Sequence, residues 1–128
     1  MIGWDAKELA RQQRQQFAEM LSGLSEVDWQ APTLCPGWRV HDVVAHVISY
    51  LDRSRNQFAA EIFHARGRIA QLNDAGIRTH DSDLPEQLCQ LMRLGATPTG
   101  IGASCGGRVA LLECLIHQQD ICRPLGQH

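Results

Sequence analysis

Three side chains that commonly bind metals, His46, Glu113 and His117, occur at spacings that could bring them to one point. Glu113 and His117 are four residues apart, so on a helix they project from the same face. His46 lies between Val43 and Tyr50 in an apolar helical pattern, which places it on the inner side of its helix. A buried carboxylate is costly unless it is paired or binds a metal. Together these residues predict a site for one divalent metal.

The donor set indicates which kind of metal site to expect. Two histidines and one carboxylate leave a coordination position for water or substrate, as in catalytic rather than closed structural zinc sites. Zinc is the expected ion. Spacing alone does not select it, because the same cysteine-free set also suits iron or nickel. An alternative stays open, in which Glu113 forms an ion pair with His117 or Arg108 and His46 is an ordinary core histidine.

Helical segments are needed to position these groups, and apolar residues recur at helical spacing in four parts of the chain. We find no stretch of the strict alternation typical of a strand, which predicts an all-α fold. The expected helices cover approximately residues 5–24, 39–66, 84–94 and 108–123. The expected connections are Ser25–Gly37, the polar loop Asn73–Ser82 and the glycine-rich stretch Gly95–Gly107.

Some positions within these segments carry expectations of their own. The Gln- and Arg-rich run Arg11–Gln16 is predicted to be a solvated face of the first helix. His41 falls off the helical face that carries His46 and is expected to be exposed. Asp83 is expected to cap the third helix, and Leu84 to face inward along it.

Length and composition limit the classes of function. The chain of 128 residues is expected to form a single domain over residues 1–128. A net charge of -2 with interspersed signs argues against a nucleic-acid or anionic-membrane partner. The five cysteines form no Cys-x-x-Cys pair, which is typical of a reducing compartment. There is neither a signal peptide nor an apolar run of the roughly 20 residues that a membrane span needs, so a cytoplasmic location is expected.

Two blocks of sequence resemble those of a known family. The first is Asp28-Trp29 followed by Pro32-Thr33-Leu34-Cys35-Pro36-Gly37-Trp38-Arg39-Val40-His41-Asp42-Val43-Val44-Ala45-His46-Val47. The second is Leu112-Glu113-x3-His117-x2-Asp120-Ile121-x-Arg123-Pro124-Leu125-Gly126. In residue type, order and separation they resemble the metal-binding N-terminal domain of the mycothiol-dependent maleylpyruvate isomerase family, part of the wider DinB-like superfamily. Together the two blocks frame almost the whole chain.

The resemblance implies a fold, a site and a cosubstrate. The fold would be a DinB-like four-helix bundle with one long crossover connection, with His46, Glu113 and His117 holding the metal between the second and fourth helices. The cosubstrate would be mycothiol, the low-molecular-weight thiol of actinobacteria. This agrees with the expected metal, since a divalent metal stabilises thiolate over thiol at neutral pH. The expected activity is that of a thiol transferase or isomerase acting on a small electrophile. In the isomerase, a transient thiol adduct would let the substrate double bond rotate from cis to trans.

Four further residues are candidates for the surroundings of the metal, namely Asp120, Arg123, Trp38 and Tyr50. Asp120 could hold the ring nitrogen of either ligand histidine opposite the metal, or it could instead pair with Arg123. Trp38 and Tyr50 could wall the thiol pocket or pack in the core. Cys35 has no neighbour in sequence that would lower its pKa, and it is interpreted as structural. No catalytic residue beyond the metal ligands is assigned.

The length of the chain leaves two classes of function open. Family members that isomerise maleylpyruvate carry a further C-terminal domain, and this chain ends at His128. Isomerase activity is therefore not expected of residues 1–128, while thiol transfer to a small electrophile is. The alternative is a non-catalytic, metal-stabilised helical bundle used for binding or dimerisation, with a second copy of the chain as its partner.

Overall fold

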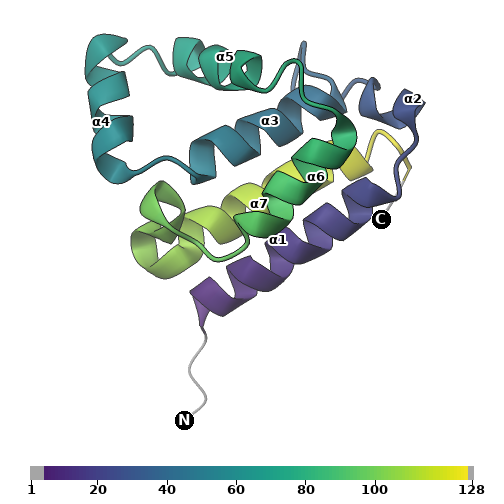
Figure 1. Ribbon diagram of the computed structural model, residues 1–128, viewed down its shortest axis with the longest axis horizontal. Coiled ribbons are helices and arrows are strands. Elements are labelled where there is room, and N and C mark those ends of the chain that lie inside the picture. Colours follow the sequence, from purple (N-terminus) through teal and green to yellow (C-terminus); the bar gives the residue numbers. More distant parts are fainter. Residues whose placement is uncertain (1–4, 127–128) are drawn as a thin grey trace.

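The regular elements that the computed structural model describes, over residues 5–126, are helices joined by short connections (Figure 1). In chain order they are α1 (Ala6–Ser22), α2 (Glu26–Trp29), α3 (Val40–Leu51), α4 (Arg55–His64), α5 (Ile69–Thr79), α6 (Pro85–Leu94), the 3₁₀ segment η1 (Gly100–Gly107) and α7 (Arg108–Cys122). Within this range we find an isolated bridge between Pro32 and Arg39 but no strand. The predicted all-α class is confirmed.

One apolar core lies between α1, α3, α6 and α7. Helices α1 and α3 each pack against both α6 and α7. The largest fully buried side chains include Phe17, Leu21, Trp29, Leu51, Leu88, Met92 and Ile121. Because burying such a side chain contributes about 1.5–3 kcal/mol, this core fixes where α3 and α7 lie relative to each other. Among residues 5–126, none of the helices has the length and apolar character that a membrane span requires.

The predicted second helix, residues 39–66, is wrong in its length, because the chain breaks after Leu51. The Arg53 carbonyl accepts the Ile101 N–H at 3.0 Å, so it does not continue the helical ladder. One residue later the Ser54 hydroxyl accepts the Gln57 N–H at 3.0 Å and starts α4 as an N-cap. Because apolar residues keep helical spacing on both sides of the break, the sequence pattern does not reveal it.

The predicted polar loop Asn73–Ser82 is also wrong, because most of it belongs to helix α5. Helix α5 packs along α3, as Figure 1 shows. The contact is close at Gly76, whose carbonyl accepts a hydrogen bond from the Ser49 hydroxyl at 2.9 Å. A Cβ on Gly76 would lie 2.9 Å from the Ser49 Cβ, so only glycine fits here. Packing against α3 thus outweighs the polar composition of α5.

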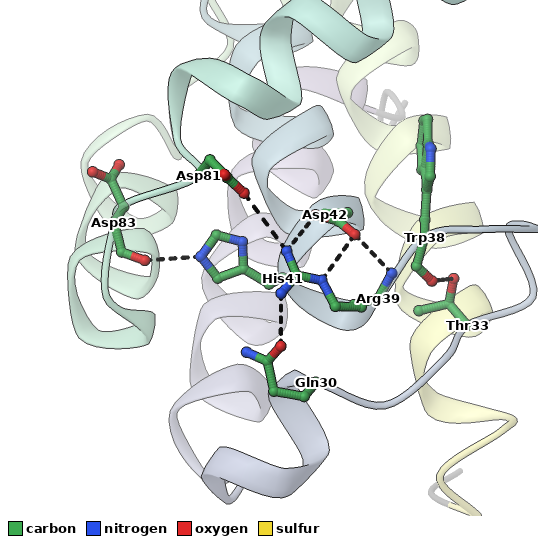
Figure 2. A network of polar contacts seen from close by, with 8 residues as sticks. All are labelled: Gln30, Thr33, Trp38, Arg39, His41, Asp42, Asp81 and Asp83. Atoms are coloured by element: carbon green, nitrogen blue, oxygen red, sulfur yellow. Dashed lines mark hydrogen bonds and ion pairs between the residues drawn. The ribbon is translucent and has the colours of Figure 1, made fainter.

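A polar network holds the start of α3 (Figure 2). The Arg39 guanidinium donates to Asp42 at 3.0 and 3.1 Å and to Gln30 at 2.6 Å. His41, predicted to be exposed, is buried, and its Nε2 lies 2.8 Å from the Asp83 carbonyl oxygen. That prediction was wrong because α2 and the segment before α6 both cover this end of α3, so more than one face of the helix is buried there.

Helix α6 begins one residue later than predicted. Its N-cap is Leu84, whose N–H donates to the Gln87 side chain at 2.7 Å. The Asp83 carboxylate instead accepts from His80 at 2.8 Å. Leu84 is 62% exposed and does not face inward as predicted, while Leu88 further along the helix is fully buried. The apolar stripe of α6 therefore starts a turn later than the sequence pattern indicates.

The predicted solvated run Arg11–Gln16 contains one buried charge, Arg14. Its guanidinium donates to the carbonyls of Met92 at 2.8 Å and Leu91 at 3.2 Å, near the C-terminus of α6. It also pairs with Asp52, the C-cap of α3, at 3.1 Å. A buried charge is tolerated when it is paired and hydrogen-bonded, so Arg14 ties together the ends of α3 and α6.

Candidate metal centre

The three predicted ligands meet where α3 packs against α7. His46 comes from α3, and Glu113 and His117 come from successive turns of α7. The ligand atoms of the three residues lie within 4.8 Å of one another. Glu113 Oε2 is 3.1 Å from His117 Nε2 and 3.7 Å from His46 Nε2. The side chains are largely buried, with exposed fractions of 11% for His46, 14% for His117 and 27% for Glu113.

These separations fit the ligands of a single ion. A tetrahedral ion with bonds of about 2.0–2.2 Å to nitrogen and oxygen holds its ligand atoms roughly 3.3–3.6 Å apart. The two measured distances to Glu113 Oε2, 3.1 and 3.7 Å, bracket that range. The planes of the His46 and His117 rings are nearly perpendicular, at 81°, with centroids 5.0 Å apart. Both imidazoles thus approach one carboxylate oxygen from different directions.

The protons of His117 provide a further test of whether a cation fits. Its Nδ1 lies 3.0 Å from Asp120 Oδ2, and because an ionised carboxylate only accepts, Nδ1 carries the proton. Neutral His117 then points a bare Nε2 lone pair at Glu113, whose Oε2 is buried without a well-directed hydrogen-bond donor. Two lone pairs facing each other at 3.1 Å require a cation between them, either a proton or a metal ion.

The pKa shifts of the metal-free site have the same origin. Burial opposes the charge of Glu113, but the neighbouring His117 and His46 outweigh burial and lower the pKa of Glu113 to about 2. Burial likewise disfavours charged His117, yet Glu113 and then Asp120 outweigh it and raise the pKa of His117. The site therefore concentrates negative potential at Nε2 of His117, which suits a bound cation.

A second group of polar side chains adjoins the ligands. Asp120, which accepts from His117 Nδ1, also accepts from the Cys35 thiol at 3.4 Å. Burial, followed by the hydrogen bond to Asp120, raises the pKa of Cys35 to about 11, so Cys35 is a thiol at neutral pH. By accepting the Nδ1 proton of His117, Asp120 holds that ring in the tautomer that leaves Nε2 available to a metal. Arg123 donates instead to Gln119, at 3.2 Å.

Aromatic rings surround His46. The Trp38 ring lies 5.1 Å from it, centroid to centroid, and the Tyr50 ring stacks on it at 6.0 Å with an interplanar angle of 24°. Tyr50 also packs edge-on against Phe58. In Figure 2 the Trp38 ring points away from the polar network around His41. These contacts limit the rotation of the His46 ring.

An open cavity of about 570 Å³ gives access to the centre. His46, His117, Asp120, Cys35 and Trp38 line one part of it, and Ala70, Asn73 and Asp74 of α5 line another. The cavity is large enough for a small molecule. Helix α5 is thus part of the candidate site.

A comparison with known protein families finds a match over most of the chain. The family described as the mycothiol maleylpyruvate isomerase N-terminal domain matches residues 10–100. The chain belongs to this family. The matched region contains His46, while Glu113 and His117 lie beyond it. No curated protein and no solved structure matches the chain significantly.

Most of the site residues predicted from the sequence lie together in the structure of this family member. The structure brings His46, Glu113 and His117 together, places Asp120 against His117, and places Trp38 and Tyr50 against His46. The pairing of Asp120 with Arg123 gives way to the pairing with His117. The contribution of α5 was missed because Asn73 and Asp74 were predicted to lie in a loop. Cys35 was considered structural, and its position beside Asp120 becomes visible only when the loop before α3 is placed on α7.

Proposed function

We propose that this domain binds one divalent metal, with zinc as the expected ion, through His46, Glu113 and His117. The observation that carries the proposal is the approach of two imidazole nitrogens to one buried carboxylate oxygen, at 3.1 and 3.7 Å. Asp120 supports it by fixing the Nδ1–H tautomer of His117. A metal bound there would favour the thiolate form of an incoming thiol at neutral pH.

We further propose that the cosubstrate is mycothiol and that the second substrate is a small electrophile. Family membership supports a small thiol, and the cavity lined by His46, His117 and Trp38 supports a small-molecule site. In the proposed transfer to an activated carbon–carbon double bond, the thiol loses its proton, its sulfur bonds to the electrophilic carbon as the π bond breaks, and the adjacent carbon takes up a proton. In an isomerisation, the same adduct would rotate about the former double bond; the adjacent carbon would then lose a proton, the double bond would re-form, and the thiolate would leave and regain a proton.

Family membership supports a DinB-like four-helix bundle forming one domain over residues 1–128, and we propose that fold here. The shared core of α1, α3, α6 and α7 supports the bundle. The segment that holds α4 and α5 would then be the long crossover connection between the second and third bundle helices. This segment also supplies part of the cavity wall, so the crossover would contribute to the site.

Metal analysis followed by an activity assay tests the proposal. We expect about one equivalent of zinc per chain after purification, with loss of that metal in His46→Ala, Glu113→Ala and His117→Ala. The control is His64→Ala, which removes an exposed histidine of α4 and should retain the metal. The loaded protein should accelerate conjugation of mycothiol to a panel of small electrophiles, and the three ligand variants should not.

Each outcome of this experiment has a consequence. Parent protein that holds no stoichiometric metal would refute the site and favour the Glu113–His117 ion pair. Metal that is bound without any conjugation would favour the non-catalytic bundle used for binding or dimerisation. Maleylpyruvate belongs in the panel, because its isomerisation by the loaded protein would show that residues 1–128 suffice for the isomerase reaction.

A further inference from the structure

We propose that Cys35, Asp120 and His117 form a second metal site, which takes a soft divalent ion such as cadmium. This site uses Nδ1 of His117, the ring nitrogen that the first site does not use. It goes beyond the proposed function and does not require that the first site be occupied.

The three donor atoms converge on one point. Sγ of Cys35, Oδ2 of Asp120 and a ring nitrogen of His117 lie within 4.8 Å of one another. Asp120 Oδ2 is 3.4 Å from the Cys35 sulfur and 3.0 Å from His117 Nδ1. Ligands of a tetrahedral zinc-like ion, with bonds of about 2.0–2.3 Å, lie roughly 3.3–3.7 Å apart. Small side-chain adjustments would therefore complete three corners of such a site, and the fourth corner opens onto the cavity that these residues line.

The backbone around Cys35 is already held in place. The Cys35 N–H donates to the Thr33 hydroxyl at 3.1 Å, and the Cys35 carbonyl accepts the Trp38 N–H at 3.0 Å. The Leu34 N–H donates to the Asp120 carbonyl at 3.0 Å, which joins this loop to the end of α7. Cys35 and Asp120 are thus fixed relative to each other by main-chain bonds, and an ion would not have to order the loop when it binds.

Two protons lie between the three atoms that would bind the ion. The Cys35 S–H and the His117 Nδ1–H both donate to one oxygen of Asp120. A divalent ion would displace both, leaving a thiolate, a ring nitrogen and a carboxylate as ligands. With the first site empty, the imidazole proton can move to Nε2, so binding releases only the thiol proton to solvent. With the first site filled, His117 would bridge the two ions as an imidazolate and both protons would leave.

The donor chemistry selects the class of ion. A thiolate with an imidazole favours soft or borderline ions, whereas magnesium and calcium require oxygen ligands. The same thiolate makes the site detectable, because sulfur bound to cadmium gives an ultraviolet charge-transfer band that nitrogen and oxygen ligands do not give.

A cadmium titration of the full chain tests the second site. We expect the parent to bind two equivalents of cadmium, one of them with the charge-transfer band of a single thiolate. Cys35→Ser should bind one equivalent without the band, since its hydroxyl can still donate to Asp120 but is a poor ligand. Cys105→Ser is the matched control, because it removes an exposed thiol elsewhere and should keep the band. Circular dichroism checks that each variant is folded.

The outcomes separate this proposal from the proposed function. Parent protein without the band, or Cys35→Ser with it, would overturn the second site. One equivalent that shows the band and is unchanged in His46→Ala would support the second site and contradict the first. One equivalent without the band that is lost in His46→Ala would support the first site and refute the second.

Discussion

Two carboxylates on the same helix, Glu113 and Asp120, contrast in what surrounds them. Glu113 Oε2 is approached by two imidazole nitrogens at 3.1 and 3.7 Å but is buried without a well-directed hydrogen-bond donor. Asp120 Oδ2 accepts from His117 Nδ1 at 3.0 Å and from the Cys35 thiol at 3.4 Å. Glu113 therefore needs a cation, whereas protons already satisfy Asp120. Residue type alone would have made the two equivalent.

Substitution of His117, which contacts both carboxylates, should have the largest effect on zinc binding. We expect His117→Ala to weaken zinc binding by more than the roughly 10–100-fold that loss of an outer-shell partner costs, because a ligand itself is lost. Chelator competition measures the affinity, and His64→Ala should match the parent. Parent-like zinc affinity in His117→Ala would show that Glu113 is satisfied in some other way.

The dependence of zinc affinity on pH distinguishes a metal at Glu113 from a proton. Below about pH 6 affinity should fall by up to about a hundredfold per pH unit, because imidazole ligands bind metal only when they are neutral and the site has two of them. The raised pKa of His117 makes its proton compete from a higher pH than an ordinary histidine, while Glu113, with a pKa of about 2, does not compete. Chelator titrations across pH should show a one-proton slope in His46→Ala. The same slope and affinity in that variant as in the parent would contradict the three-ligand site.

Asp120 should matter less than the ligands, because it acts through His117. We expect Asp120→Asn to weaken zinc binding by about 10-fold, at the low end of the range for outer-shell partners, because an amide oxygen can still accept from Nδ1. Cys35→Ser should leave zinc affinity at the first site unchanged. The same competition titrations serve for both variants. If Asp120→Asn weakened binding as much as His117→Ala does, Asp120 would be a ligand of that zinc.

The smallest expected effect is on stability. In metal-free protein the raised pKa of His117 stabilises the fold below the unfolded pKa of about 6.5, and this stabilisation is lost as pH rises through the folded pKa. Bound metal reverses this dependence of stability on pH, because a metal binds only unprotonated imidazoles. The Tm difference between parent and His117→Gln should therefore decrease from pH 6 to pH 8 in metal-free protein. In zinc-loaded protein the same difference should increase over this range. We expect a few degrees, since 1 kcal/mol shifts Tm by roughly 4–8 °C in a small domain. Equal trends with and without zinc would argue against metal at His117.

Local patterns predict the elements in which one face is apolar and the ends carry clear stop or start residues. The first, third and fourth predicted helices correspond to α1, α6 and α7 within a few residues at each end. The four-residue spacing of Glu113 and His117 holds wherever a helix forms, so their common direction required no knowledge of the tertiary structure. The inward position of His46 followed from the same periodicity.

The larger errors share one physical cause, which is contact with distant parts of the chain. The break between α3 and α4 depends on Ile101 binding the Arg53 carbonyl, and α5 depends on the close approach of Gly76 to Ser49. Arg14 is buried only because the carbonyls near the end of α6 accept its protons. None of these partners lies within the window over which a periodicity is counted.

Residue type and local spacing were enough to predict the helical class, the family and the three ligand candidates. Tertiary packing was needed to show that Glu113 Oε2 is buried between two imidazoles, that Asp120 pairs with His117 rather than with Arg123, and that Cys35 donates to Asp120. The reason is that a buried polar atom is satisfied or unsatisfied by neighbours that converge on it in space. Here those neighbours come from α3, from α7 and from the loop before α3, which only the packed core brings together.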